Sequence, residues 1–167
     1  MGVRIEQERP EHVAAIRVLT DAAFKDAPHS AQTEARIVDA LRAAGALTLS
    51  LVAVEDGEVV GHAAFSPVTI NGAESNWYGL GPVSVRPDRQ RRGLGQGLIR
   101  NGLQQLKAMD AAGCVVLGDP GYYGRLGFES DPELYYGDVP PGYFQRLTFT
   151  GAAPKGEVSY HPGFDVS

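Results

Sequence analysis

Apolar and polar residues alternate with two different periods along the first third of the chain. Residues 3–7 show the two-residue period of a short strand, whereas apolar residues from Val13 to Ala23 recur at helical spacing. A second helical pattern includes residues 37, 38 and 41; we expect Ser30 to cap it and Gly45 to end it. This part of the sequence therefore predicts one strand followed by two helices.

The middle of the chain has the pattern of several strands around one long helix. Apolar runs at residues 47–54 and 59–68 flank a turn at residues 55–57, which predicts an antiparallel pair. After a turn at Asn71-Gly72, we expect a strand over residues 77–85. We expect a helix over residues 94–112, closed by Gly113, and a short buried strand over residues 114–117.

The last part of the chain has a different composition. One or two helical turns are expected over residues 122–126, but residues 129–167 are rich in proline and glycine, and one strand is predicted there, over residues 143–148. Four of the seven tyrosines lie in this segment: Tyr135, Tyr136, Tyr143 and Tyr160. Two interpretations stay open, because these rings either wrap the core or line a substrate pocket.

Composition limits the function classes. The 167 residues are 43% hydrophobic and 21% charged, which is typical of a globular protein, and we expect one domain over residues 1–167. The net charge of −5 argues against a general nucleic-acid binder. No apolar run approaches the roughly 20 residues that span a bilayer. The single cysteine, Cys114, cannot form an internal disulfide, and we expect a cytoplasmic protein.

Arginine and glycine are concentrated in one stretch of this acidic chain, RPDRQRRGLGQGL at residues 86–98. It follows a predicted strand and opens a predicted helix, whose first amides have no internal acceptor. Glycines let a phosphate approach those amides closely, and arginines attract its charge. The stretch therefore has two interpretations: it forms either a phosphate cradle or a solvated basic turn. The spacing fits neither a P-loop nor the dinucleotide fingerprint G-x-G-x-x-G.

The stretch fits Q/R-x-x-G-x-G/A at residues 90–95, and at this point the sequence resembles the GNAT superfamily of acyl-CoA-dependent N-acetyltransferases. GPVSVRPDRQRRGLGQGLI, from Gly81 to Ile99, is similar to the family's fourth strand, pyrophosphate loop and third helix. GYYGRLGF, from Gly121 to Phe128, is similar to its closing Tyr-x-x-x-Gly-Phe element. The resemblance covers roughly residues 3–150, and LGDPGYYGRLGF is especially like the YhbS-like branch.

The resemblance implies a mixed α/β fold whose central, mostly antiparallel sheet is flanked by helices and splayed between the fourth and fifth strands. It also implies acetyl-CoA as co-substrate, no metal, and acetyl transfer to a primary amine by direct attack. The acceptor is a small-molecule or a protein amine, and a homodimer is compatible with the sequence. The alternative from another class is a noncatalytic acyl-CoA-binding sensor or regulatory module.

The family's functional positions map onto eleven residues. The resemblance implies that the fourth strand binds the pantetheine arm, that the glycine-rich loop binds the pyrophosphate, and that Tyr123 contacts the cofactor and is the general acid. The strand and loop residues are Val83, Ser84, Val85, Gln90, Arg91, Arg92, Gly93, Leu94, Gly95 and Gln96.

Several residues also have a structural interpretation, such as packing or helix capping. Tyr123 has a packing alternative, and for Tyr122 we expect packing. We expect Asp119 to cap the short helix. No carboxylate lies in the predicted strand 77–85, so water-mediated deprotonation of the amine is expected, with Glu74 as a weak candidate base. The four histidines (His12, His29, His62 and His161) show no metal-ligand spacing with one another or with Cys114.

Overall fold

A computed structural model describes residues 2–28, 30–140 and 142–166 of the chain. The first half of the chain forms β1 (Val3–Gln7), α1 (Val13–Phe24), α2 (Glu34–Ala43), β2 (Leu49–Glu55), β3 (Glu58–Ile70) and β4 (Ala73–Val85). The second half forms α3 (Leu94–Ala108), β5 (Gly113–Leu117), α4 (Pro120–Gly124), β6 (Glu129–Ser130), β7 (Leu134–Tyr135), β8 (Phe144–Thr148) and β9 (Gly156–Tyr160). Short 3-10 segments are η1 (Pro10–His12), η2 (Pro87–Arg89) and η3 (Pro162–Asp165).

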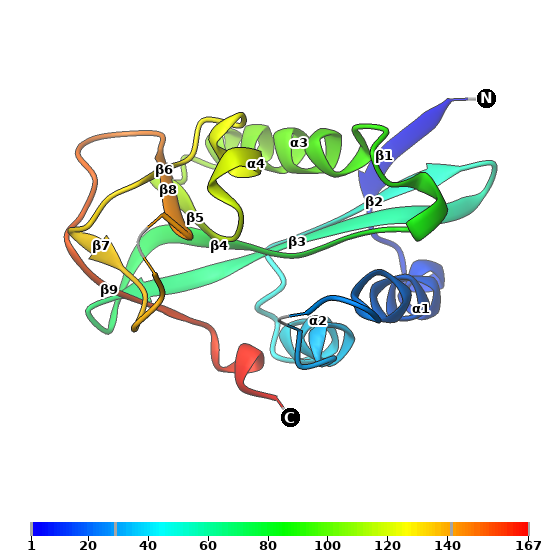
Figure 1. The fold of residues 1–167 in the computed structure, drawn as a ribbon, viewed down its shortest axis with the longest axis horizontal. Coiled ribbons are helices and arrows are strands. Elements are labelled where there is room, and N and C mark those ends of the chain that lie inside the picture. Colours follow the sequence, from blue (N-terminus) through cyan, green and yellow to red (C-terminus); the bar gives the residue numbers. More distant parts are fainter. Residues whose placement is uncertain (1, 29, 141, 167) are drawn as a thin grey trace.

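One sheet runs through the molecule in the order β1-β2-β3-β4-β5-β8-β6. Its neighbours are antiparallel except β4 and β5, which are parallel because α3 carries the chain back between them. β9 pairs with the end of β3 and with β7. Figure 1 shows α3 and α4 on one face of the sheet and α1 and α2 on the other. The expected mixed, mostly antiparallel sheet flanked by helices is confirmed.

Helices on both faces explain why the central strands are apolar on both sides. Along β2, Leu51 and Ala53 pack into the core beneath α3, whereas Val52 and Val54 pack with Ile16 of α1 on the opposite face. Each face of the sheet therefore has its own hydrophobic core, and β2 and β3 are buried between the two.

A bulge interrupts β4 at Gly81 and Pro82. Val83 pairs with Ala63 and Leu80 pairs with Phe65, so two residues of β4 lie opposite the single Ala64 of β3. An extra residue shifts the alternation of side chains along a strand by one position. For this reason both Leu80 and Val83 contact the core beneath α3, although they are three positions apart and would point to opposite faces of a regular strand.

The bulge marks the place where β4 leaves β5. Their pairing runs from Trp77–Gly113 to Leu80–Val116 and goes no further, although β4 continues to Val85. Among the described residues, no strand pairs with this edge of β4 beyond the bulge. The expected splay between the fourth and fifth strands is confirmed, and it leaves backbone groups of β4 open toward the gap.

Two expected helix ends are wrong. α2 begins at Glu34 with Thr33 as its N-cap, and Ser30 donates a hydrogen bond to the Glu34 side chain instead of capping the helix. α3 ends at Ala108, because the chain turns through Asp110, whose φ is 63°. Gly113 is consequently the first residue of β5 and not the helix terminator.

The C-terminal segment contains more structure than the sequence predicted. The expected strand over residues 143–148 is β8, which pairs with β5 and extends the sheet past the gap. β9 was not expected; it pairs with residues 68–70 of β3. Chain after β9 reaches α2, where Phe164 packs against the buried cluster that contains Ile37 and Leu41.

A buried polar chain crosses the interior beneath α2. Arg42 donates two hydrogen bonds to the Glu8 carboxylate, at 2.7 and 2.8 Å, and the Ser50 hydroxyl donates a third at 2.5 Å. His62 Nε2 lies 2.8 Å from the same hydroxyl oxygen. Because the one hydroxyl hydrogen is directed at Glu8, the imidazole donates to Ser50 through Nε2.

The pKa of His62 is lowered to about 4, mainly by burial; the Glu8 carboxylate opposes this shift, and Arg42 contributes to it. Nδ1 has no hydrogen-bond partner among the described residues, so a proton added there would be a buried, unpaired charge.

This arrangement predicts a pH-dependent stability. Between pH 6.5 and about 4 the unfolded chain binds a proton at His62 that the folded chain does not, so the free energy of unfolding falls as pH falls through this window. Urea unfolding at pH 7.5 and pH 5 should show that the wild type loses about 2 kcal/mol more than His62→Gln. Parallel losses in the two proteins would contradict the neutral, buried state of His62.

Candidate active site

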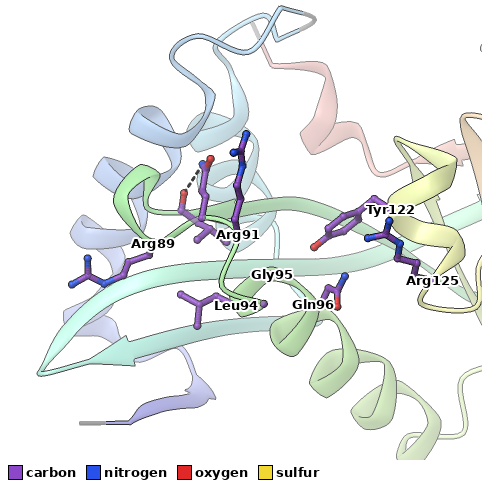
Figure 2. A pocket seen from close by; sticks show the side chains of 10 residues that line it. Arg89, Arg91, Leu94, Gly95, Gln96, Tyr122 and Arg125 are labelled. Atoms are coloured by element: carbon purple, nitrogen blue, oxygen red, sulfur yellow. Dashed lines mark hydrogen bonds between the residues drawn. The ribbon is translucent and has the colours of Figure 1, made fainter.

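A cavity of about 470 Å³ lies where the loop after β4 meets the start of α3 and α4 (Figure 2). We call it the cradle. Its lining residues come from the end of β4, from the arginine- and glycine-rich stretch, and from α4 with its C-cap: Val85, Arg89, Gln90, Arg91, Gly93, Leu94, Gly95, Gln96, Tyr122 and Arg125. Most of the residues that were expected to bind a pyrophosphate thus line one cavity.

The backbone at the start of α3 forms the floor of the cradle. Gly93 is the N-cap with φ of 80°, a left-handed conformation that glycine adopts without strain, and no side chain caps the helix. The amide of Gly97 donates to the Gly93 carbonyl at 3.0 Å, whereas the helical amides before it have no acceptor one turn back. With the positive end of the helix dipole, these amides suit an anion such as a phosphate.

Gln90 fixes the loop to the strand that precedes it. Its side-chain Nε2 donates to the Val85 carbonyl at 3.1 Å, the dashed line in Figure 2. The hydrogen bond ties the loop back to the end of β4 and so holds Gly93 and the start of α3 next to the gap in the sheet.

The arginines of the loop divide into two kinds. Arg86 is paired with Asp88 at 2.7 Å and Glu58 at 2.9 Å, and Arg89 with Glu55 at 2.5 Å; these hydrogen bonds raise the pKa of both guanidinium groups. Within the described residues, neither Arg91 nor Arg92 takes part in an ion pair.

Only one of these two unpaired side chains reaches the cradle. Arg91 lines it, whereas Arg92 is exposed and lies outside the lining. The expected cofactor position Arg92 can therefore act at the cradle through its backbone or its long-range charge.

Tyr122 of α4 and Arg125, the C-cap of α4, also line the cradle, although neither was expected there. Figure 2 shows Tyr122 and Arg125 side by side opposite Gln96. A Cβ atom on Gly95 would lie 2.9 Å from the Tyr122 hydroxyl, so the glycine gives this ring its room. Tyr122 also packs against the core, as expected. The sequence feature that could have predicted this pair is the three-residue spacing of Tyr122 and Arg125, which places both side chains on one face of a helical turn.

A second cavity, of about 370 Å³, lies where β4 and β5 separate, and we call it the splay cavity. Both faces of the sheet contribute to it. Its lining residues are Phe24, Glu34, Ile37, Leu80, Gly81, Pro82, Val83, Leu117, Tyr123, Tyr136, Tyr160 and Phe164. Val85 and Tyr122 line the cradle, and Val83 and Tyr123 line the splay cavity. A long ligand in the cradle can therefore continue along β4 into the splay cavity.

Tyr123 is held in the splay cavity by close packing. Its ring meets Tyr122 at 4.9 Å and Phe128 at 6.0 Å between centroids, both nearly edge to face. Asp119 accepts a hydrogen bond from the Gly121 amide at 2.9 Å and so caps α4, as expected. Burial raises the pKa of Tyr123 to about 12, which keeps its hydroxyl protonated at neutral pH and able to donate.

The expected strand residues lie in different surroundings. Val85 lines the cradle and Val83 the splay cavity. The Ser84 side chain lies on the other face, where its hydroxyl donates to Thr20 of α1 at 3.4 Å, so only its backbone faces the gap. Glu74 is near the β3–β4 turn, opposite Thr69, and lines neither cavity.

Two of the four C-terminal tyrosines pack against the core and also line a cavity. Tyr136 and Tyr160 line the splay cavity, whereas Tyr135 and Tyr143 are exposed and lie outside it. Tyr160 meets Tyr136 edge to face with 5.0 Å between centroids and lies 5.0 Å from Phe164. Its buried hydroxyl has no hydrogen-bond partner among the described residues. This end of the chain therefore forms one aromatic wall of the cavity.

Metal and thiolate chemistry have little support among the described residues. Within the described residues, no group of three or more histidine, cysteine, aspartate or glutamate side chains is arranged to hold a metal ion, and no helix is long and apolar enough to cross a membrane. Burial raises the pKa of the Cys114 thiol, which disfavours a thiolate. His29 lies outside the described residues.

Comparison with known proteins finds acetyltransferases by both sequence and structure. The family model "Acetyltransferase (GNAT) domain" matches residues 4–130. The uncharacterized N-acetyltransferase YhbS of Escherichia coli strain K12 is 44% identical over 97 residues, which are 58% of this chain and 58% of that protein. The match thus spans less than two thirds of the length of this curated relative.

Two solved structures resemble the chain over nearly its full length. A GNAT family acetyltransferase from Brucella melitensis, in complex with acetyl-CoA, is 55% identical with a TM-score of 0.89, covering 98% of this chain and 99% of that one. YhbS from Escherichia coli, in complex with CoA, is 33% identical with a TM-score of 0.89, covering 98% and 92%.

The packing of Tyr123 predicts a matched pair of glycine variants. A Cβ atom on Gly118 would lie 2.5 Å from Cε2 of the Tyr123 ring, whereas one on Gly124 would meet nothing within 4 Å. Gly118→Ala should therefore lower the free energy of unfolding by about 1–3 kcal/mol, and Gly124→Ala should leave it unchanged or slightly higher. Urea unfolding measures both, and equal stability of the two variants would rule out the tight contact.

Proposed function

The chain belongs to the GNAT acetyltransferase family, and from that membership we propose that it transfers an acetyl group from acetyl-CoA to a primary amine. The observation that carries the proposal is the pair of cavities along β4. The cradle is suited to a pyrophosphate, and the splay cavity presents a protonated tyrosine at the gap in the sheet.

In this proposal the cofactor lies along β4. The amides of residues 93–96 and the Arg91 guanidinium bind the pyrophosphate, and the open backbone edge of β4 beyond the bulge binds the pantetheine arm. The acetyl-CoA and CoA complexes of the two similar structures support this choice of ligand. Tyr122 and Arg125 extend the site from α4.

The reaction then takes place in the splay cavity. The neutral amine attacks the thioester carbonyl carbon, the resulting oxyanion re-forms the carbonyl, and the carbon–sulfur bond breaks. Tyr123 donates its proton to the leaving sulfur, and the proton lost by the amine returns to the tyrosine through water. A raised tyrosine pKa favours this role over that of a base. β4 carries no carboxylate near the gap, which supports proton removal through water.

The ligand assignment predicts a difference between two arginines. A thermal-shift titration of the wild type should show stabilisation by acetyl-CoA and CoA, by about 2.7 kcal/mol at 100 times the dissociation constant, and not by ATP or NAD. Arg91→Ala should weaken CoA binding about tenfold or more, because it removes a charge-assisted hydrogen bond to phosphate. Arg86→Ala is the matched control: its partners are Asp88 and Glu58, so CoA affinity should not change. Equal effects of the two variants would contradict the assignment.

The role of the tyrosine predicts a separation of turnover from binding. Tyr123→Phe should lower kcat by about 10²–10⁴-fold, because it removes the proton donor, and should leave CoA affinity nearly intact. Release of the CoA thiol measures turnover, and calorimetry measures binding. Unchanged turnover would reject Tyr123 as the acid, whereas CoA binding without turnover of any amine by the wild type would favour a noncatalytic acyl-CoA-binding module.

A further inference from the structure

Glu34 lines the splay cavity and gives this part of the site an acidic side chain. It is the one carboxylate among the described lining residues, which contain no lysine, arginine or histidine. The cradle has the opposite character, since Arg89, Arg91 and Arg125 line it. The site is therefore basic where we propose the phosphates and acidic at the far end, on the face of the sheet that α2 covers (Figure 1).

The carboxylate is oriented by a neighbouring hydroxyl. Ser30 Oγ lies 2.7 and 2.6 Å from the two carboxylate oxygens of Glu34, and Glu34 is the first residue of α2. A hydroxyl supplies one hydrogen, whereas a carboxylate accepts about four hydrogen bonds. Glu34 thus keeps acceptor positions for a further donor while its side chain is held in place.

The remaining walls are aromatic and apolar. Tyr136, Tyr160 and Phe164 form the aromatic wall, and Phe24 and Ile37 also line this part. Aromatic faces attract cations and also pack against apolar carbon. A volume of about 370 Å³, which must also admit the acetyl end of the cofactor, suits a compact acceptor.

From these observations we infer that the acceptor is a compact primary amine with an apolar body and no carboxylate beside the nitrogen, and that Glu34 binds its ammonium group. The inference rests on the proposed acetyl transfer and narrows its substrate class. Glu34 determines specificity: it favours a cationic amine and repels a free amino acid, whose own carboxylate would face it. The amine loses its proton through water before it attacks.

Phenethylamine and phenylalanine are matched probes, because they share an aromatic body and differ by one carboxylate. Calorimetric titration of the CoA-bound wild type should give a dissociation constant at least about tenfold lower for phenethylamine. In Glu34→Gln, phenethylamine should bind at least about tenfold more weakly and the preference between the two probes should shrink, while Glu34→Asp should keep part of it. Glu74→Gln is the control, since that carboxylate lines neither cavity, and it should match the wild type.

Three results would overturn the inference: no binding of phenethylamine, equal binding of the two probes by the wild type, or unchanged binding in Glu34→Gln. CoA affinity, measured on the same preparations, should be equal in wild type and variants and shows that each is folded. Thiol release with acetyl-CoA and a panel of amines distinguishes a wrong acceptor class from a wrong proposed function. Acetylation of other amines without binding of phenethylamine would reject this acceptor class alone, whereas no acetylation of any amine would reject the proposed function.

Discussion

Two residues of β4, Gly81 and Pro82, lie opposite a single residue of β3, and the two cavities depend on this mismatch. The bulge shifts the alternation of side chains, so that Val83 and Val85 face the α3 side. Pairing of β4 with β5 ends just before it. Proline has no amide hydrogen to offer a neighbouring strand, and glycine accepts the bulge conformation, with φ of 136° at Gly81. A regular β4 would direct Val83 and Val85 to the opposite face of the sheet, away from the α3 side.

The arginines near the cradle differ in whether a carboxylate of the protein already pairs with them. The β2–β3 hairpin carries Glu55 and Glu58, which pair with Arg89 and Arg86 and hold the loop on the sheet. Arg91 is left to line the cradle. The net charge of −5 says nothing about this arrangement, because a few well-placed groups determine the potential within a cavity. The acidic Glu34 at the far end gives one site two electrostatic characters.

Much of the fold follows from local patterns. The period of apolar residues located α1, β1 to β4 and α3 to within a few residues, because each buries a regular face. Helix ends were less predictable: Thr33 starts α2 and Asp110 turns the chain after α3, and neither position has a distinctive residue pattern. β9 was missed because its five residues lie in the segment rich in proline and glycine and are held mainly by pairing with β3 and β7.

The sequence by itself located the loop that forms the cradle, because glycines and arginines between a strand and a helix are a local pattern of consecutive residues. Gln90, Arg91 and residues 93–96 were identified from consecutive positions. Only the tertiary structure decided which distant residues meet at the splay cavity. Glu34, Tyr136 and Tyr160 are separated by up to 126 positions in the chain, and pairing of β9 with β3 brings the last of them to the gap. Such contacts depend on how strands pair across the whole sheet, which local spacing does not specify.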